Sequence, residues 1–213
     1  MAIQITVIPV TPLQQNCALV FDSESKRGAV FDPGGDVERI AAVVDEAGVT
    51  LDAIYLTHGH IDHAGGADAL RERLGVPVVG PHEADRPLLA NLARQGREYG
   101  VADARDVEPD RWLAHGDTEE IAGVAFAVSH APGHAPGHVV FHAPSLGFAH
   151  VGDVLFAGSI GRTDLPMGDH DTLLASIRDV CLRWPDETQF LCGHGPGSTI
   201  GRERASNPFL RGL

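Results

Sequence analysis

Three histidines and one aspartate stand within six residues of each other, at His58, His60, Asp62 and His63. Imidazole and carboxylate groups are the ligands that hold zinc, iron or manganese in proteins. The apolar run 51–56 comes directly before them and predicts a buried strand that delivers the cluster from the core. Fortuitous histidine patches on a surface have no reason to follow a buried strand. The segment therefore predicts half of a metal centre.

Further residues of the same chemical types follow later apolar runs. His134 comes after the run 121–128, Asp153 after 148–151 and His194 after 189–192. Each stands directly after a glycine, which lets the backbone turn sharply. We expect these residues to converge with the first cluster at one edge of the core, where they complete two metal coordination spheres.

These segments resemble the metallo-β-lactamase superfamily and, within it, the glyoxalase II branch. The matching segments are Thr-His-Gly-His-Ile-Asp-His at 57–63, Ala-Pro-Gly-His at 131–134, Gly-Asp at 152–153 and Gly-His at 193–194. The resemblance implies an α/β (α+β) fold, a four-layer αββα sandwich, formed by residues 1–213 as a single domain. It also implies two divalent metal ions. We expect zinc, with iron or manganese as alternatives. One ion would be held by His58, His60 and His134, the other by Asp62, His63 and His194, and Asp153 would bridge them.

Such a metal pair implies hydrolysis. Two metals about 3.5–4 Å apart can share a hydroxide and polarise a carbonyl group together. Metal binding lowers the pKa of water from about 15.7 to near 7, so no serine or cysteine nucleophile is needed. We expect the metal-bound hydroxide to attack a thioester such as S-lactoylglutathione, with Asp62 as a catalytic residue that orients the nucleophile or moves a proton.

The sequence departs from the longer glyoxalase II enzymes near the expected substrate. Only residues 195–213 follow His194, so we expect no helical C-terminal glutathione-binding domain. Arg162 matches a cationic position that would bind a substrate carboxylate, but Asp164 stands where those enzymes have an aromatic residue. Those enzymes also have a tyrosine shortly after the last metal-binding histidine, whereas residues 195–197 here are Gly-Pro-Gly. The chain resembles short bacterial glyoxalase II-like proteins more closely, and the physiological thioester stays open.

Other activities of the same superfamily compete with thioester hydrolysis. The main alternative is a mononuclear iron persulfide dioxygenase, because such enzymes carry a Gly-Arg-Thr-Asp segment like that at 161–164. The segment Gly-His-Gly-Pro at 193–196 favours the short hydrolases instead. Lactonase or β-lactamase activity is a third reading. A binding module that a metal merely stabilises is disfavoured by seven candidate ligands.

Composition and charge limit the partners and the compartment. The chain has 29 acidic and 16 basic residues, for a net charge of −13. Such a surface repels phosphate backbones, which argues against nucleic acid. No apolar run approaches the roughly 20 residues that span a bilayer, and the first ten residues lack the basic region of a secretory signal. Cys17, Cys181 and Cys192 are widely spaced, as in reduced proteins. We expect a cytoplasmic protein with a small-molecule thioester substrate and no membrane partner. Its oligomeric state is open.

Hydrophobic periodicity predicts the elements that position these residues. Strands are expected at 3–9, 17–22, 28–32, 51–56, 76–80, 121–128, 138–142, 148–151 and 189–192, and helices at 37–47, 67–74 and 171–182. A helix with loops is expected over 82–111, and Asp32 begins a turn. His138, four residues after His134, is a candidate hydrogen-bonding partner of the ligands, and Cys192 a small buried hydrophobic residue. Structural or surface roles are expected for His82, His115, His130, His142, His150 and His170.

Overall fold

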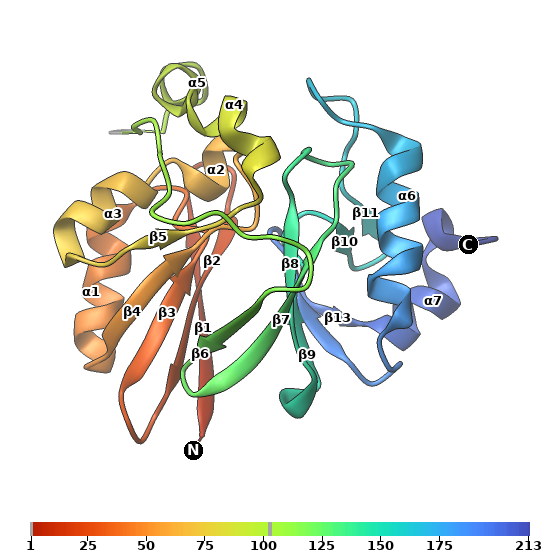
Figure 1. Ribbon diagram of the computed structural model, residues 1–213, viewed down its shortest axis with the longest axis horizontal. Helices are drawn as coiled ribbons and strands as arrows, with labels where there is room; N and C mark the ends of the chain where they lie inside the picture. Colours follow the sequence, from red (N-terminus) through yellow and green to blue (C-terminus); the bar gives the residue numbers. More distant parts are fainter. Residues whose placement is uncertain (1, 102–103) are drawn as a thin grey trace.

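Two β-sheets face each other in the computed structural model, which describes residues 2–101 and 104–213 (Figure 1). The first sheet has five strands in the order β1-β2-β3-β4-β5. They are β1 (Ile3–Val10), β2 (Gln15–Asp22), β3 (Arg27–Phe31), β4 (Thr50–Tyr55) and β5 (Val78–Val79). The first three run antiparallel, whereas β4 and β5 are parallel to their neighbours. Parallel pairing requires crossover connections, and these are made by α1 (Val37–Ala47) and α3 (Ala67–Leu74).

The second sheet has six strands in the order β13-β12-β9-β8-β7-β6. They are β6 (Thr118–Ile121), β7 (Val124–His130), β8 (Val139–Ala143), β9 (Phe148–His150), β12 (Gln189–Leu191) and β13 (Ser198–Thr199). A separate hairpin pairs β10 (Leu155–Phe156) with β11 (Ser159–Ile160). Helix α6 (His170–Asp179) crosses over to β12, which is parallel to β9, and α7 (Ile200–Ser206) follows β13.

Short helices occupy the remaining connections. They are α2 (Ile61–Ala64), α4 (Arg86–Leu89), α5 (Leu92–Tyr99) and the 3₁₀ turns η1 (Glu83–Asp85), η2 (Pro144–Leu146), η3 (Cys181–Arg183) and η4 (Pro208–Leu210). Among the described residues, no helix is both long enough and apolar enough to cross a bilayer.

Alternating side chains of the strands separate three hydrophobic cores. In β2, Cys17 and Leu19 pack toward the helices of the first half, whereas Ala18 and Val20 pack toward the second sheet. A third core lies between the second sheet and α6 with α7. Because successive side chains of a strand point to opposite faces, each sheet is covered on both sides. The layers are therefore helix, sheet, sheet and helix, which confirms the expected αββα sandwich.

The predicted strand at 121–128 is wrong, because the structure has a tight hairpin there. Strand β6 ends at Ile121 and β7 begins at Val124, and the two residues between them, Ala122 and Gly123, have φ angles of 54° and 77°. A two-residue hairpin loop of this kind needs positive φ at both positions. Alanine rarely adopts such a φ, so the sequence lacked the usual turn signal.

Other predicted boundaries differ less. The strand expected at 76–80 shortens to β5, and the helix expected at 171–182 ends at Asp179, with η3 after it. Strands β10, β11 and β13 and helix α7 were missed, because segments of two to seven residues are too short to show a clear period. Helices α1 and α3 have the predicted bounds, and each is followed by a glycine in the left-handed conformation, Gly48 and Gly75.

Phe31 joins the two sheets at the centre of the sandwich. Its ring is fully buried and lies 5.1 Å from the ring of Phe141 and 5.3 Å from that of Tyr55. We expect Phe31→Ala to lower the free energy of unfolding by about 3–5 kcal/mol, the cost of a buried cavity. Urea denaturation measures this loss. Phe209→Ala is the matched control: that ring is 49% exposed, so its removal should change stability by less than about 0.5 kcal/mol. Equal losses in both variants would contradict a central role for Phe31.

Candidate metal centre

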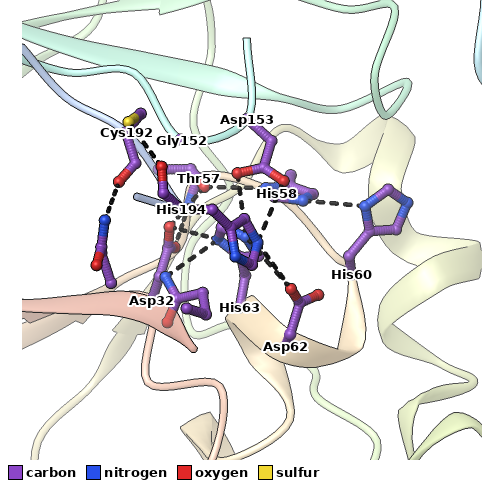
Figure 2. A network of polar contacts seen from close by, with 12 residues as sticks. Asp32, Thr57, His58, His60, Asp62, His63, Gly152, Asp153, Cys192 and His194 are labelled. Carbon is purple, nitrogen blue, oxygen red and sulfur yellow. Dashed lines mark hydrogen bonds and ion pairs between the residues drawn. The ribbon is translucent and has the colours of Figure 1, made fainter. Parts of the chain in front are cut away.

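The structure brings all seven predicted ligands together, at the edge of the sandwich where α2 lies (Figure 1). Figure 2 labels all of them except His134. His58 and His60 follow β4, and Asp62 and His63 lie on α2. The others come from the second half of the chain: His134 from the β7–β8 loop, and Asp153 and His194 from the loops after β9 and β12. Strands of both sheets thus end at the same place, as the sequence predicted.

Three of the predicted ligands form a group made only of histidine, His58, His60 and His134, which we call the histidine group. Nδ1 of His60 lies 3.0 Å from Nε2 of His58 and 2.9 Å from Nε2 of His134. Burial lowers the pKa of all three rings, that of His60 to about 3. Neutral imidazoles each carry one proton and one lone pair, so the group offers lone pairs to a cation.

The other nitrogen of two of these rings is held by a hydrogen bond. Nδ1 of His134 donates to the carbonyl oxygen of Arg162 at 2.8 Å. Oγ1 of Thr57 donates to Asp32 at 2.7 Å and therefore accepts from Nδ1 of His58 at 3.0 Å. Such partners set the tautomer and the orientation of a metal-binding histidine. In both rings they leave the Nε2 lone pair directed into the group.

The remaining four predicted ligands, Asp62, His63, Asp153 and His194, form the mixed group. Nε2 of His194 lies 3.0 Å from Oδ2 of Asp62, and Nε2 of His63 lies 3.3 Å from Oδ1 of Asp153. The opposite nitrogens are held from outside. Nδ1 of His63 donates to Asp32 at 2.9 Å, and Nδ1 of His194 donates to the carbonyl oxygen of Leu13 at 3.2 Å. Figure 2 shows these side chains directed toward one another.

Two buried atoms of the mixed group lack a hydrogen-bond partner among the described residues. They are Nε2 of His63 and Oδ1 of Asp153, which face each other. A buried polar atom without a partner is costly, and each one in a folded protein needs an explanation. A divalent cation between them satisfies both, because a histidine nitrogen and a carboxylate oxygen are both metal ligands. The donor set therefore fits divalent metal.

Electrostatics in the mixed group also favour a cation. Burial acts to raise the pKa of Asp153, but His63, His134 and His194 lower it well below its usual range. Burial likewise acts to lower the pKa of His63, yet the carboxylates of Asp153, Asp62 and Asp32 raise it. The lowered pKa values of Asp153 and Asp62 mean that both carboxylates are ionised at neutral pH. They stabilise positive charge at the point where the side chains meet.

Asp32 is a site residue that the sequence analysis treated only as the start of a turn. Its carboxylate is fully buried and accepts from the backbone N–H and the hydroxyl of Thr57, both at 2.7 Å, as well as from His63. It thereby orients one histidine of each group. The signal was available: Asp32 follows the buried strand β3 directly, as Asp153 follows an apolar run.

His138 is buried beside the ligands, in line with the partner role considered for it. Its ring stacks on His58 with centroids 4.6 Å apart, and its Nε2 accepts the backbone N–H of Asp153 at 3.0 Å. Most of the other histidines make ring contacts elsewhere. His82 stacks on His130, His142 on Trp184 and the buried His150 on Phe31.

Arg162 and Cys192 lie next to the ligands without joining either group. The guanidinium of Arg162 is exposed and makes two hydrogen bonds of 2.8 Å to Asp164, so its predicted contact with substrate stays a prediction. Cys192 is buried, and burial raises the pKa of its thiol to about 11. Its Sγ donates to the carbonyl oxygens of His194 and Pro196, which agrees with its expected role as a small buried residue.

Comparison with known proteins agrees with this geometry. Residues 10–194 match the family model "Metallo-beta-lactamase superfamily". The chain is 43% identical to hydroxyacylglutathione hydrolase GloC of Haemophilus influenzae, over 97% of each chain. It is 39% identical to the B3 metallo-beta-lactamase BLEG-1, whose crystal structure superposes with a TM-score of 0.90 and covers 98% of this chain and 100% of that one. It is also 39% identical to TTHA1623, solved in a di-iron-bound form, with a TM-score of 0.86 and coverage of 96% and 100%. The chain belongs to the metallo-beta-lactamase superfamily and is a metallohydrolase.

Proposed function

We propose that this metallohydrolase cleaves the thioester of a hydroxyacylglutathione such as S-lactoylglutathione, to give a hydroxy acid and free glutathione. The observation that carries the proposal is the convergence of seven histidine and aspartate donors at one sheet edge. The choice of thioester is supported by the relative from Haemophilus influenzae, which is named a hydroxyacylglutathione hydrolase.

The proposal includes two divalent ions, and zinc is the metal that we propose. His58, His60 and His134 would hold one ion, Asp62, His63 and His194 the other, and Asp153 both. When bound, such ions lower the pKa of water to near 7 and polarise a carbonyl oxygen. The di-iron form of TTHA1623 supports a two-ion site and keeps iron as an alternative metal.

We propose that Asp62 orients the water nucleophile or accepts its proton. Although burial acts to raise its pKa, His63 and His194 lower it, so the carboxylate is ionised at neutral pH. Its Oδ2 lies 3.0 Å from Nε2 of His194, and about a tenth of the side chain is exposed. An ionised carboxylate in this position can orient a water molecule or accept its proton.

The proposed partners are limited to small molecules. Arg162 would bind a carboxylate of the glutathione moiety, in competition with Asp164, which holds its guanidinium. We also propose a cytoplasmic location, because the three cysteines are buried and free, as in a reducing compartment. The proposed unit is a single αββα domain.

Metal analysis combined with parallel assays tests the proposal. We expect up to two metal ions per chain and release of free thiol from S-lactoylglutathione. Chelation should abolish this release, and added zinc should restore it. Oxygen consumption with glutathione persulfide tests the dioxygenase alternative on the same samples. One iron per chain with oxygen uptake and no thiol release would overturn the hydrolase proposal.

β-Lactam hydrolysis is the second candidate, because BLEG-1, 39% identical to this chain, is a B3 metallo-beta-lactamase. A chromogenic cephalosporin tests it on the same preparation. We expect thioester cleavage to exceed β-lactam cleavage in kcat/KM. The reverse order would replace the thioester by a β-lactam as the proposed substrate.

A further inference from the structure

Asp85 is a buried carboxylate near the metal centre that belongs to neither group of ligands. It ends the 3₁₀ turn η1, and its side chain is fully buried. Oδ2 accepts the backbone N–H of Gly59 at 2.7 Å, and Oδ1 accepts the backbone N–H of Gly137. A single carboxylate thus takes one hydrogen bond from each of two separate loops.

The two loops carry the histidine group and come from different sheets. Gly59 stands between His58 and His60, in the loop that follows β4 of the first sheet. Gly137 stands three residues after His134, in the loop that joins β7 and β8 of the second sheet. The relative position of the two loops decides how far the ring of His134 lies from the rings of His58 and His60. Asp85 connects the two loops directly.

Close packing shows that this connection has little freedom. A Cβ atom at Gly137 would lie 2.5 Å from the carbonyl oxygen of His82 and 2.7 Å from the carboxyl carbon of Asp85. A Cβ atom at Gly59 would lie 2.9 Å from Cβ of Leu88 and 3.4 Å from Cβ of Asp85. The loops approach η1 and α4 this closely only because both positions are glycine.

The charge of Asp85 strengthens the two hydrogen bonds that it accepts. Burial raises the pKa of its carboxyl to about 6, while the N–H groups of Gly137 and Gly59 act to lower it. The carboxylate is therefore the main form at pH 7. Hydrogen bonds to an ionised acceptor are shorter and stronger than those between neutral groups, so two of them hold the loops firmly.

We propose that Asp85 is a positioning residue that sets the spacing between His134 and the pair His58 and His60, and thereby the metal affinity of the histidine group. The inference rests on the proposed metal site. Ligand-orienting partners of this kind typically change metal affinity by about 10–100-fold when they are replaced. The mixed group has its own support from Asp32 and Leu13, so it should be little affected.

Zinc titration of Asp85→Asn and Asp85→Ala tests the proposal. Asparagine keeps the size of the side chain but sets an NH₂ group against one of the two N–H donors. We expect wild-type protein to bind two zinc ions, and each variant to bind one of them about 10–100-fold more weakly. Because the two loops loosen, amide hydrogen exchange at Gly59 and Gly137 should also become faster. In the thioester assay, kcat should fall while KM stays close to the wild-type value.

Glu203→Gln provides a matched control. Glu203 is another buried carboxylate that accepts a backbone N–H, that of Gly158 at 2.7 Å. It lies on α7, and its partners Gly158, Ser198 and Asn207 lie outside the two loops of the histidine group. This variant should keep both zinc affinities and slow exchange at Gly59 and Gly137. Circular dichroism establishes that each variant is folded. If Asp85→Ala does not fold, Gly59→Ala perturbs the same contact from the loop side and should weaken the same zinc ion.

Unchanged zinc affinity with unchanged amide exchange in Asp85→Asn would overturn the positioning role. Equal weakening of both zinc ions would also overturn it, because the role is specific to the histidine group. Zinc binding and amide exchange are measured without substrate. A failure of the proposed thioester activity would therefore leave this test intact, and the two failures can be distinguished.

Discussion

Replacement of Asp153 by alanine is expected to abolish thioester hydrolysis, with kcat/KM lowered by ~10³-fold or more, or ~4 kcal/mol of transition-state stabilisation. Asp153 is the carboxylate that approaches both groups of ligands. Its oxygens lie 3.3 Å from Nε2 of His63, 3.5 Å from that of His134 and 3.6 Å from that of His194. Its removal takes away one negative charge and the link between the two groups, so metal content should fall together with activity.

The asparagine and alanine variants of Asp153 together separate the effect of its charge from the effect of its size. Asp153→Asn keeps the shape and loses the negative charge, and should be nearly as inactive as Asp153→Ala. Asp179→Ala is the control, because Asp179 is an exposed acid on α6 that pairs with Arg178, and this variant should keep both metal and activity. Metal analysis and thiol release measure the outcome. Near-normal turnover by Asp153→Ala would refute the assignment of the site.

Replacement of Gly193 by alanine is expected to lower kcat/KM by ~100-fold or more, because small displacements of catalytic groups have effects of this size. The new Cβ would overlap Oδ1 of Asp153 and would lie 2.5 Å from Cε1 of His63. The backbone cannot move away easily. Gly193 donates to the carbonyl oxygen of Gly152 at 2.9 Å and accepts the N–H of Asn16 at 2.7 Å. The added methyl group therefore displaces ligands of the mixed group.

Zinc titration should show that Gly193→Ala loses affinity at the mixed group. Gly147→Ala is the matched glycine control, since a Cβ there meets no atom within 4 Å. Its φ of 56° makes alanine strained, so this control should lose about 1–2 kcal/mol of stability but keep metal and activity. If Gly193→Ala binds two ions and turns over like wild type, the space beside Gly193 is not part of the metal centre.

Much of the fold followed from local patterns. The apolar positions Ile40, Ala41 and Val44 predicted α1, and Gly48 predicted its end, because helical period and glycine caps act over a few residues. The Ala122–Gly123 hairpin escaped prediction for the converse reason. Pairing between β6 and β7 holds Ala122 at a φ that alanine by itself disfavours.

The sequence by itself determined the chemistry of the candidate site. Histidine and aspartate are recognisable as ligand types wherever they stand, and the candidate residues followed apolar runs, so their convergence was predictable. The superfamily was predictable from the resemblance of their motifs, and their role as ligands stays a prediction. The tertiary structure decided what orients them. Asp32 lies 31 residues from His63, the carbonyl group of Arg162 lies 28 residues from His134, and Asp85 lies 52 residues from Gly137. Hydrogen bonds between such distant segments depend on how the two sheets pack, and no local period encodes that packing.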